Sequence, residues 1–147
     1  MNKKLTTYFL RMLRNKHEKQ RARYTEDEEN YYLCDGYFLR VVKKEEMELN
    51  IKLFNESKAL KGVIEDTKDE KYKDAEIKYW IPDKRNKGKF IIKIVNDEMK
   101  TYISNKYLEL FEGYTSFKVI GKLKPVLCYK NETLLGLILP IRVEEEY

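Results

Sequence analysis

The chain has 147 residues, of which 42% are hydrophobic and 13% are aromatic, so it is about one domain long and can bury a core. No stretch approaches the roughly 20 uninterrupted apolar residues of a membrane span, which predicts a protein that does not cross a membrane. The net charge of +5 is uneven, because residues 1–24 carry eight basic side chains and one acidic side chain, whereas the remainder is nearly neutral. Such a basic segment is typical of a surface that contacts phosphates, although a solvated helix face gives the same pattern.

The first predicted element is an amphipathic helix over about residues 5–19, within a basic N-terminal helical region that spans 1–24. Apolar side chains recur at spacings of three and four, which places them on one face of the helix. These residues are Leu5, Tyr8, Phe9, Met12 and Leu13. Basic side chains on the other side predict a DNA-binding surface. The candidate DNA-binding residues are Lys4, Arg11, Arg14, Lys19, Arg21 and Arg23. We interpret this segment as a packed helix and not as a signal peptide.

A β-hairpin is predicted next. Apolar runs at 31–34 and 37–42 flank the dipeptide Asp35-Gly36. This pair favours a tight turn, because both residue types tolerate a positive φ.

The middle of the chain is less regular. Residues 43–54 suit a short helix and a strand equally well, and residues 79–81 predict a strand that Pro82 ends. The segment 61–78 has mixed charge and few large apolar groups. We interpret it as a charged, mobile surface loop inside one domain that spans 1–147.

The last third of the chain predicts strands around one short helix. Ser104 is a helix-capping residue type, and Gly113 is placed to end the helix after Phe111. Strands are expected at 89–95, 99–103, 115–120, 125–130 and 133–143. The order is helix then strands, followed by strands, helix and strands. This order predicts an α+β fold of two similar halves.

Four motifs carry a family resemblance. Ile103-Ser104-Asn105-Lys106-Tyr107-Leu108 is followed by Pro125-Val126-Leu127 and then by Gly136-Leu137-Ile138-Leu139-Pro140-Ile141-Arg142-Val143. In order and spacing these resemble a bacterial DNA sliding clamp, the β subunit of DNA polymerase III. In its C-terminal domain a strand leads into an N-x-x-Y-L helix, a proline-initiated strand follows, and an M-P-x-R-L strand closes the chain. Asp35-Gly36-Tyr37-Phe38-Leu39 is similar to the D-G-H-R-L hairpin of clamp domains.

The chain also departs from the clamp pattern. Leu139 stands where the family usually has methionine, and Tyr37 and Phe38 replace the His-Arg pair. The segment 61–78 has no counterpart in a clamp domain. The chain has room for one of the three domains of a clamp subunit.

The resemblance implies a DNA-clamp-like domain of two pseudo-repeated βαβββ halves, with antiparallel sheets and two main helices that face DNA. In clamps, the hairpin of one domain and the closing strand of the next form an apolar cleft that captures peptides of partner proteins. The resemblance thus implies a peptide- or partner-binding role for Tyr37, Leu39, Leu137, Leu139, Pro140, Ile141 and Arg142. A complete cleft would require self-association or a second clamp-like protein. The alternative is that these residues belong to the core and a sheet edge.

Residues that commonly carry chemistry are few. The single histidine, His17, lies among basic residues, and the sequence has no Gly-rich phosphate loop and no nucleophile motif. The acidic run at 26–29 is typical of a solvated loop. Cys34 and Cys128 lie in separate apolar runs, which predicts buried, reduced thiols in a cytoplasmic protein. We therefore expect a non-enzymatic protein with no catalytic residue, no cofactor and no bound metal.

Two functions remain open. In the first, the chain is a clamp-like DNA-associated or replication-accessory module that binds duplex DNA weakly and without sequence preference. In the second, it is a protein-interaction or inhibitory factor of a phage- or plasmid-type mobile element, and it acts on a host nucleic-acid-processing protein. The basic helix favours the first function, whereas the missing clamp domains and the neutral body favour the second. Both functions predict a protein partner or self-association.

Overall fold

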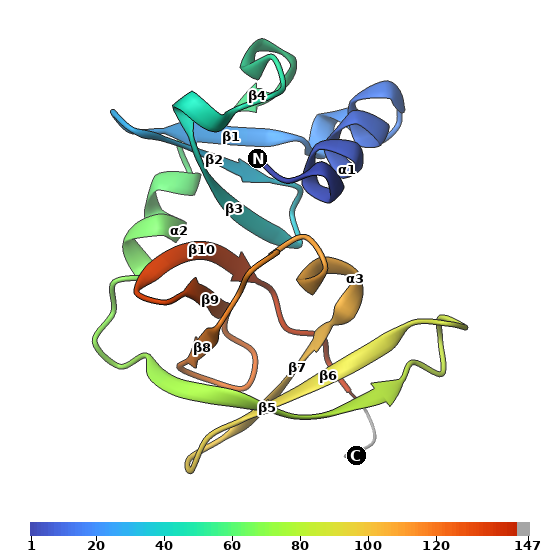
Figure 1. The fold of residues 1–147 in the computed structure, drawn as a ribbon, viewed down its shortest axis with the longest axis vertical. Coiled ribbons are helices and arrows are strands. Elements are labelled where there is room, and N and C mark those ends of the chain that lie inside the picture. Colours follow the sequence, from blue (N-terminus) through green and yellow to red (C-terminus); the bar gives the residue numbers. More distant parts are fainter. Residues whose placement is uncertain (144–147) are drawn as a thin grey trace. The chain divides into compact units, whose positions relative to one another are not determined.

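The computed structural model describes residues 1–143. The chain divides into two compact units, Met1–Asp69 (unit 1) and Glu70–Tyr147 (unit 2), and each contains helices and strands (Figure 1). The predicted α+β class is therefore confirmed. The boundary between the units falls inside the segment 61–78, which the sequence places in a loop. Among the described residues, no helix has the length and the apolarity that a bilayer crossing requires.

Unit 1 is a small sheet with helical segments. Its elements are α1 (Lys3–Arg14), the 3-10 turn η1 (Lys19–Arg21), β1 (Arg23–Glu26), β2 (Asn30–Cys34), β3 (Phe38–Lys43), the 3-10 turns η2 (Lys44–Glu46) and η3 (Ile51–Leu53), β4 (Asn55–Glu56) and α2 (Leu60–Asp66). The strand order is β4-β1-β2-β3, in which β4 runs parallel to β1 and the other neighbours are antiparallel. The two 3-10 turns replace the helix or strand expected at 43–54.

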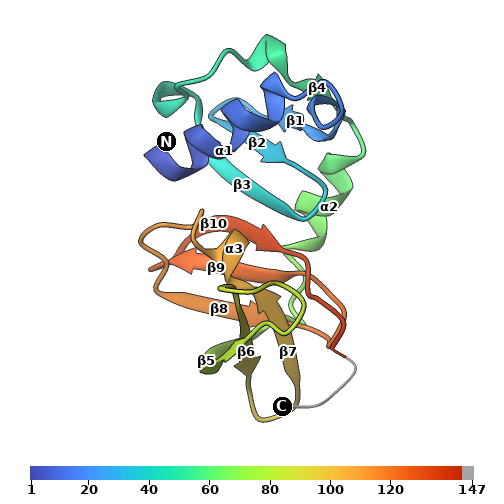
Figure 2. The ribbon, with the colours of Figure 1, turned by 90° about the vertical axis from the view of Figure 1, so that its right-hand side faces the viewer.

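The first helix packs on the sheet through aromatic side chains. Leu5, Phe9 and Met12 of α1 are buried, as their helical spacing predicts. The ring of Phe9 lies 5.7 Å from that of Phe38 in β3 and 5.1 Å from that of Phe54, measured between centroids. Figure 2 shows α1 lying across the strands of unit 1. The core of unit 1 therefore fixes which face of α1 points to solvent.

The helix α1 ends at Arg14, five residues before the predicted end. Asn15 takes an extended conformation, with φ −95° and ψ 111°, and its side-chain oxygen accepts a hydrogen bond from the His17 backbone N–H at 2.8 Å. A short polar side chain that bonds its own backbone in this way competes with helix continuation. The residues that follow form η1 and turn the chain into β1.

The hairpin predicted at Asp35-Gly36 is confirmed. Asp35 is fully buried, and its Oδ1 accepts hydrogen bonds from the backbone N–H groups of Tyr37 (2.8 Å) and Phe38 (3.1 Å). The hydroxyl of Tyr8 in α1 donates to Oδ2 of the same carboxylate. Gly36 has φ +98°, a conformation that strains residues with a Cβ. A part-buried hydrogen bond thus links the turn to α1.

Unit 2 is an antiparallel sheet with one short helix. Its elements are β5 (Lys73–Pro82), β6 (Phe90–Val95), β7 (Lys100–Ser104), α3 (Asn105–Leu108), β8 (Ser116–Val119), β9 (Val126–Lys130) and β10 (Thr133–Ile138). The strand order is β10-β9-β8-β5-β6-β7. The ten-residue strand β5 pairs with β8 over 73–75 and with β6 over 76–82. One long strand therefore joins the two parts of this sheet.

The loop predicted at 61–78 is wrong, because this segment forms most of α2 and the first part of β5. Leu60 is buried and anchors α2. In β5, the half-buried residues Ala75, Ile77 and Tyr79 alternate with exposed residues. This period of two indicates a strand with one packed face, even though most of the exposed residues are charged.

The predicted closing strand at 133–143 is too long, because β10 ends at Ile138. Pro140 has no backbone N–H with which to continue a ladder. The chain then packs beside β7, where the Ile141 N–H donates to the Tyr102 carbonyl oxygen at 2.8 Å. Ile141 and Val143 cover a small apolar cluster that includes Ile81 and Ile91.

Candidate nucleic-acid interface

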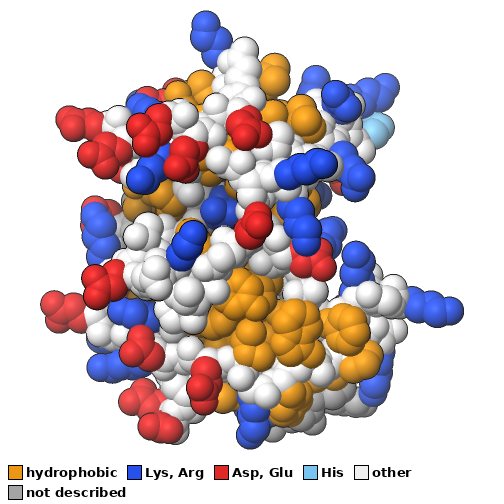
Figure 3. Space-filling view, viewed as in Figure 1, with side chains coloured by type: hydrophobic (Ala, Val, Ile, Leu, Met, Phe, Trp, Pro, Cys, Tyr) orange, Lys and Arg blue, Asp and Glu red, His pale blue; other side chains and the backbone are white. Residues whose placement is uncertain are grey.

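Unit 1 separates its charges along β1. This strand begins at Arg23, next to the basic segment formed by the last turn of α1 and by η1, and it ends at Glu26, which opens the acidic turn 26–29. Figure 3 shows the two signs over unit 1, with Lys and Arg side chains gathered on the side where α1 ends and acidic side chains gathered on the opposite side. The cationic side is the part of unit 1 suited to a polyanion.

The exposed cations of this side come from α1 and η1. Lys4 and Arg11 are seven residues apart, close to two helical turns, so they lie nearly in line on α1, with Arg14 one turn beyond Arg11. All three are exposed, and they face away from the buried stripe. Lys19 in η1 is also exposed. These four residues, Lys4, Arg11, Arg14 and Lys19, form what we call the cationic surface.

The other two predicted DNA-binding residues, Arg21 and Arg23, are half-buried against the β2–β3 turn. The guanidinium carbon of Arg21 lies 5.6 Å from the centroid of the Tyr37 ring, and the guanidinium of Arg23 lies beside Gly36. Within residues 1–143, the Nε atoms of both arginines are buried and lack a hydrogen-bond partner. The structure thus joins Tyr37, which the sequence assigns to a partner-binding cleft, to the basic segment.

A groove of about 630 Å³ shares Arg14 and Lys19 with the cationic surface. Its apolar lining consists of Leu10, Leu13 and Leu53, and Leu53 is 56% exposed. Its polar lining consists of Arg14, Lys19, Gln20, Lys52 and Asn55. Since none of these described residues is acidic, the groove combines positive charge with an apolar floor.

Local hydrogen bonds build this groove. The Asn55 side-chain amide donates to the carbonyl oxygens of Lys19 (3.3 Å) and Ala22 (3.2 Å), which holds η1 beside β4. The Asn50 side chain accepts from the Lys52 backbone N–H at 3.0 Å and so begins η3. Sequence reasoning missed the groove because its walls come from three separate segments.

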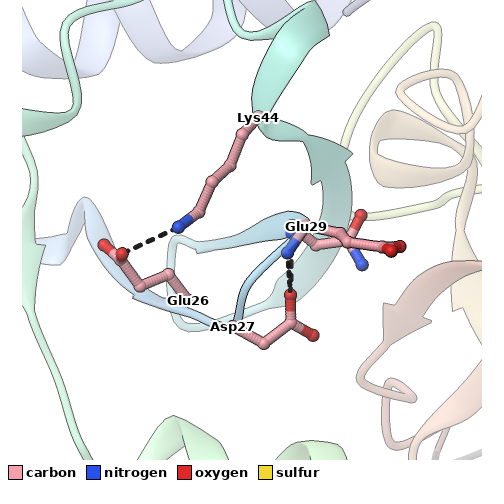
Figure 4. A network of polar contacts seen from close by, with 5 residues as sticks. Glu26, Asp27, Glu29 and Lys44 are labelled. Atoms are coloured by element: carbon pink, nitrogen blue, oxygen red, sulfur yellow. Dashed lines mark hydrogen bonds and ion pairs between the residues drawn. The ribbon is translucent and has the colours of Figure 1, made fainter.

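Two carboxylates of the acidic turn, those of Glu26 and Asp27, have partners within unit 1. Lys44 Nζ lies 2.9 Å from Glu26 Oε1, and Asp27 Oδ1 accepts from the backbone N–H groups of Glu29 (2.9 Å) and Asn30 (2.7 Å), as Figure 4 shows in part. The Tyr32 hydroxyl donates to Asp27 Oδ2 at 2.6 Å. Residues 1–143 contain no group of three His, Cys, Asp or Glu side chains arranged to hold a metal ion.

The hydrogen bond between Tyr32 and Asp27 shifts both pKa values. It is the main cause that lowers the Asp27 pKa below its ordinary value. Burial, followed by this same bond, raises the pKa of Tyr32 to about 12. The pair therefore favours an ionised Asp27 and a neutral Tyr32 at neutral pH.

Comparison with protein-family models, with curated proteins and with solved structures finds no match for this chain. The charges and the geometry described above therefore carry the functional inference.

The predicted partner-binding residues are divided between the units. Leu39 in unit 1 and Leu137 in unit 2 are buried core residues, at 2% and 4% exposure. Leu139 is 40% exposed, just beyond the end of β10, and Arg142 is exposed. Pro140 and Ile141 are half-buried. In unit 2, only part of the predicted set is thus available to a partner.

Two cysteines and one histidine are the residues of this chain with side chains typical of nucleophilic or acid–base chemistry near neutral pH. Cys34 and Cys128 are buried thiols outside any disulfide, as the sequence predicts. Burial raises the pKa of the Cys34 thiol, which disfavours the reactive thiolate. His17 is exposed in the loop after α1.

Proposed function

We propose that this protein is a cytoplasmic, non-enzymatic, clamp-like module that binds duplex DNA through the cationic surface of unit 1, weakly and without sequence preference. The observation that carries this proposal is that the four cations of this surface are exposed and, in the described part of the chain, unpaired. Within residues 1–143, Lys4, Arg11, Arg14 and Lys19 are exposed and form no ion pair with an acidic side chain. Uncompensated cations that contact phosphates release the counterions condensed on the DNA, which favours binding.

The order of the elements supports the clamp-like part of the proposal. Unit 2 contains a strand, a helix and three antiparallel strands in the order β7-α3-β8-β9-β10, which is the βαβββ order implied for a clamp half. Unit 1 contains α1 followed by the antiparallel strands β1, β2 and β3, one strand short of that order. The two halves differ in charge, because Glu109 follows Lys106 closely around α3. We therefore assign DNA contact to unit 1.

Duplex binding as a function of salt tests this proposal. Fluorescence anisotropy with labelled duplexes of unrelated sequence should give similar affinities, and these affinities should fall together as salt rises. Strong preference for one duplex, or no binding at low salt, would refute the proposed function.

The groove favours the second candidate, a mobile-element factor that binds a host protein. Its three leucines and three cations complement an acidic, amphipathic segment of a partner. Leu53→Asn should weaken capture of an acidic leucine-containing peptide and leave duplex binding within about twofold, because Leu53 is exposed and the change adds no charge beside Arg14 and Lys19. Peptide binding that survives this change would exclude the groove. A solution mass above that of one chain would instead indicate self-association.

A further inference from the structure

The outer end of the β5–β6 ribbon in unit 2 exposes two aromatic rings. Trp80 is 46% exposed and Phe90 is 41% exposed. Their ring centroids lie 6.2 Å apart, edge to face at 68°. Trp80 is paired with Ile92 and Phe90 with Pro82, and this register places both rings on one face of the ribbon. They are large apolar groups left open to solvent at a strand end.

Neighbouring apolar side chains of the ribbon are buried. On the opposite face, Ile81 and Ile91 are buried beneath Ile141 and Val143. On the face of the two rings, Ile92, which is paired with Trp80, is fully buried. Figure 3 shows hydrophobic side chains gathered over β5, β6 and β7, with Lys and Arg side chains flanking them at the hairpin end. Trp80 and Phe90 are thus the exposed large hydrophobic side chains of β5 and β6, and they lie near the end where cations gather.

Five basic side chains surround this end. They are Lys78, Lys84, Arg85, Lys87 and Lys89, and all are exposed. Residues 78–90 contain one acidic side chain, Asp83, so the segment has a net charge of +4. Lys89 is the immediate neighbour of Phe90, and Lys78 is two residues from Trp80, about 7 Å along an extended strand.

The turn binds its one carboxylate internally. Asp83 Oδ1 accepts from the Arg85 backbone N–H at 2.9 Å, and Oδ2 accepts from the Asn86 side-chain amide at 3.0 Å. The hydrogen bond from the Asn86 side chain is the main cause that lowers the Asp83 pKa, and the bond from the Arg85 N–H lowers it further. The Asp83 N–H also donates to the Lys89 carbonyl oxygen at 2.9 Å, which closes the turn. The basic side chains therefore extend from an ordered hairpin.

We propose that this end of the ribbon binds single-stranded nucleic acid. The bases would stack on Trp80 and Phe90, and the phosphates would contact the surrounding cations. Stacking on an aromatic side chain is tolerant of sequence, because every base has a π face. A duplex offers no free base faces along its length, so this site differs in ligand from the cationic surface of unit 1. We refer to it as the ribbon site.

Trp80 is itself the probe, because it is the only tryptophan of the chain. Titration of the full chain with oligothymidylate at low salt should quench the tryptophan fluorescence, and added salt should reverse the quenching. Fluorescence that does not change while labelled oligothymidylate also fails to bind would overturn the proposal.

Substitutions at Trp80 separate stacking from simple apolar contact. Trp80→Leu keeps an apolar side chain but removes the π face, so oligothymidylate affinity, measured by anisotropy of a labelled strand, should fall about tenfold or more. Trp80→Phe should retain most of the affinity. Equal binding by the Leu variant and the parent would refute stacking. If the parent binds anionic phospholipid vesicles but not oligothymidylate, and the Leu variant binds the vesicles as well, the site contacts membranes instead.

Two double variants of unit 2 test the role of the lysines in the ribbon site, one at the site and one elsewhere as a matched control. Lys87→Gln with Lys89→Gln should weaken oligothymidylate binding and reduce the log–log slope of its salt dependence by about 1.4 at most, at about 0.7 per phosphate contact of a single strand. Lys124→Gln with Lys130→Gln removes the same charge from exposed positions outside the ribbon and should have little effect. Equal losses in the two double variants would contradict a localised site. Arg11 and Arg14 variants test the duplex surface separately.

Discussion

Replacing Arg11 and Arg14 by glutamate should weaken binding to every duplex alike. If all four residues of the cationic surface contact phosphates, the log–log dependence of affinity on salt has a slope of about −3.6, so affinity falls about 150-fold from about 50 to 200 mM salt. With two contacts removed, the slope should be about −1.8 and the fall about 12-fold over the same range. Repulsion between glutamate and phosphate adds to the loss at low salt.

Anisotropy of labelled duplexes over this salt range measures the slope. Lys58→Glu with Lys61→Glu provides the matched control, because it makes the same change of charge at exposed positions of unit 1 around the start of α2. Glutamate in the last turn of α1 opposes the helix dipole and should cost about 0.3–1 kcal/mol per residue, so thermal unfolding must be followed in parallel. A folded variant that keeps the parent slope, or a control with an equal loss, would refute the assignment.

Two further predictions concern stability. Asp27→Asn should lower the free energy of unfolding at neutral pH, and the deficit should shrink as pH falls below the ordinary pKa of 3.8, because a depressed folded-state pKa stabilises only the ionised form. Urea unfolding at several pH values measures this, with the exposed Glu28→Gln as the control; a deficit independent of pH would contradict it. Leu137→Asp should cost about 3 kcal/mol or more because Leu137 is buried, whereas Leu139→Asp should cost under about 1 kcal/mol. A large loss for Leu139→Asp would place that residue in the core.

The features predicted from the sequence are those set by local chemistry. The hairpin could be predicted because the conformational preferences of Asp35-Gly36 alone favour a tight turn. The buried face of α1 follows from the spacing of Leu5, Phe9 and Met12. The end of α1 was missed because one side-chain hydrogen bond, from His17 N–H to Asn15, decides it.

The features that escaped prediction depend on residues far apart in the sequence. The strand β5 has only half-buried residues on its packed face until Ile81, and its charged neighbours obscure the alternation. The groove beside α1 requires η1 and η3 to meet, and the contact that holds η1 in place runs from Asn55 to Lys19 and Ala22. The cationic residues themselves were identifiable from composition alone. Which of them are exposed was not, since Arg21 and Arg23 pack against the hairpin turn.

The separation of charge along β1 gives unit 1 an electric dipole moment. The positive end of this dipole, at Arg23, and its negative end, at Glu26, are about 10 Å apart along β1. This separation is close to the Debye length at about 0.1 M salt. In the field of a polyanion, such a dipole experiences a torque that turns the basic end forward before contact. If the proposed duplex binding holds, a larger fraction of diffusional encounters would begin in the productive orientation, and the charge pattern would raise the association rate in addition to any gain in affinity.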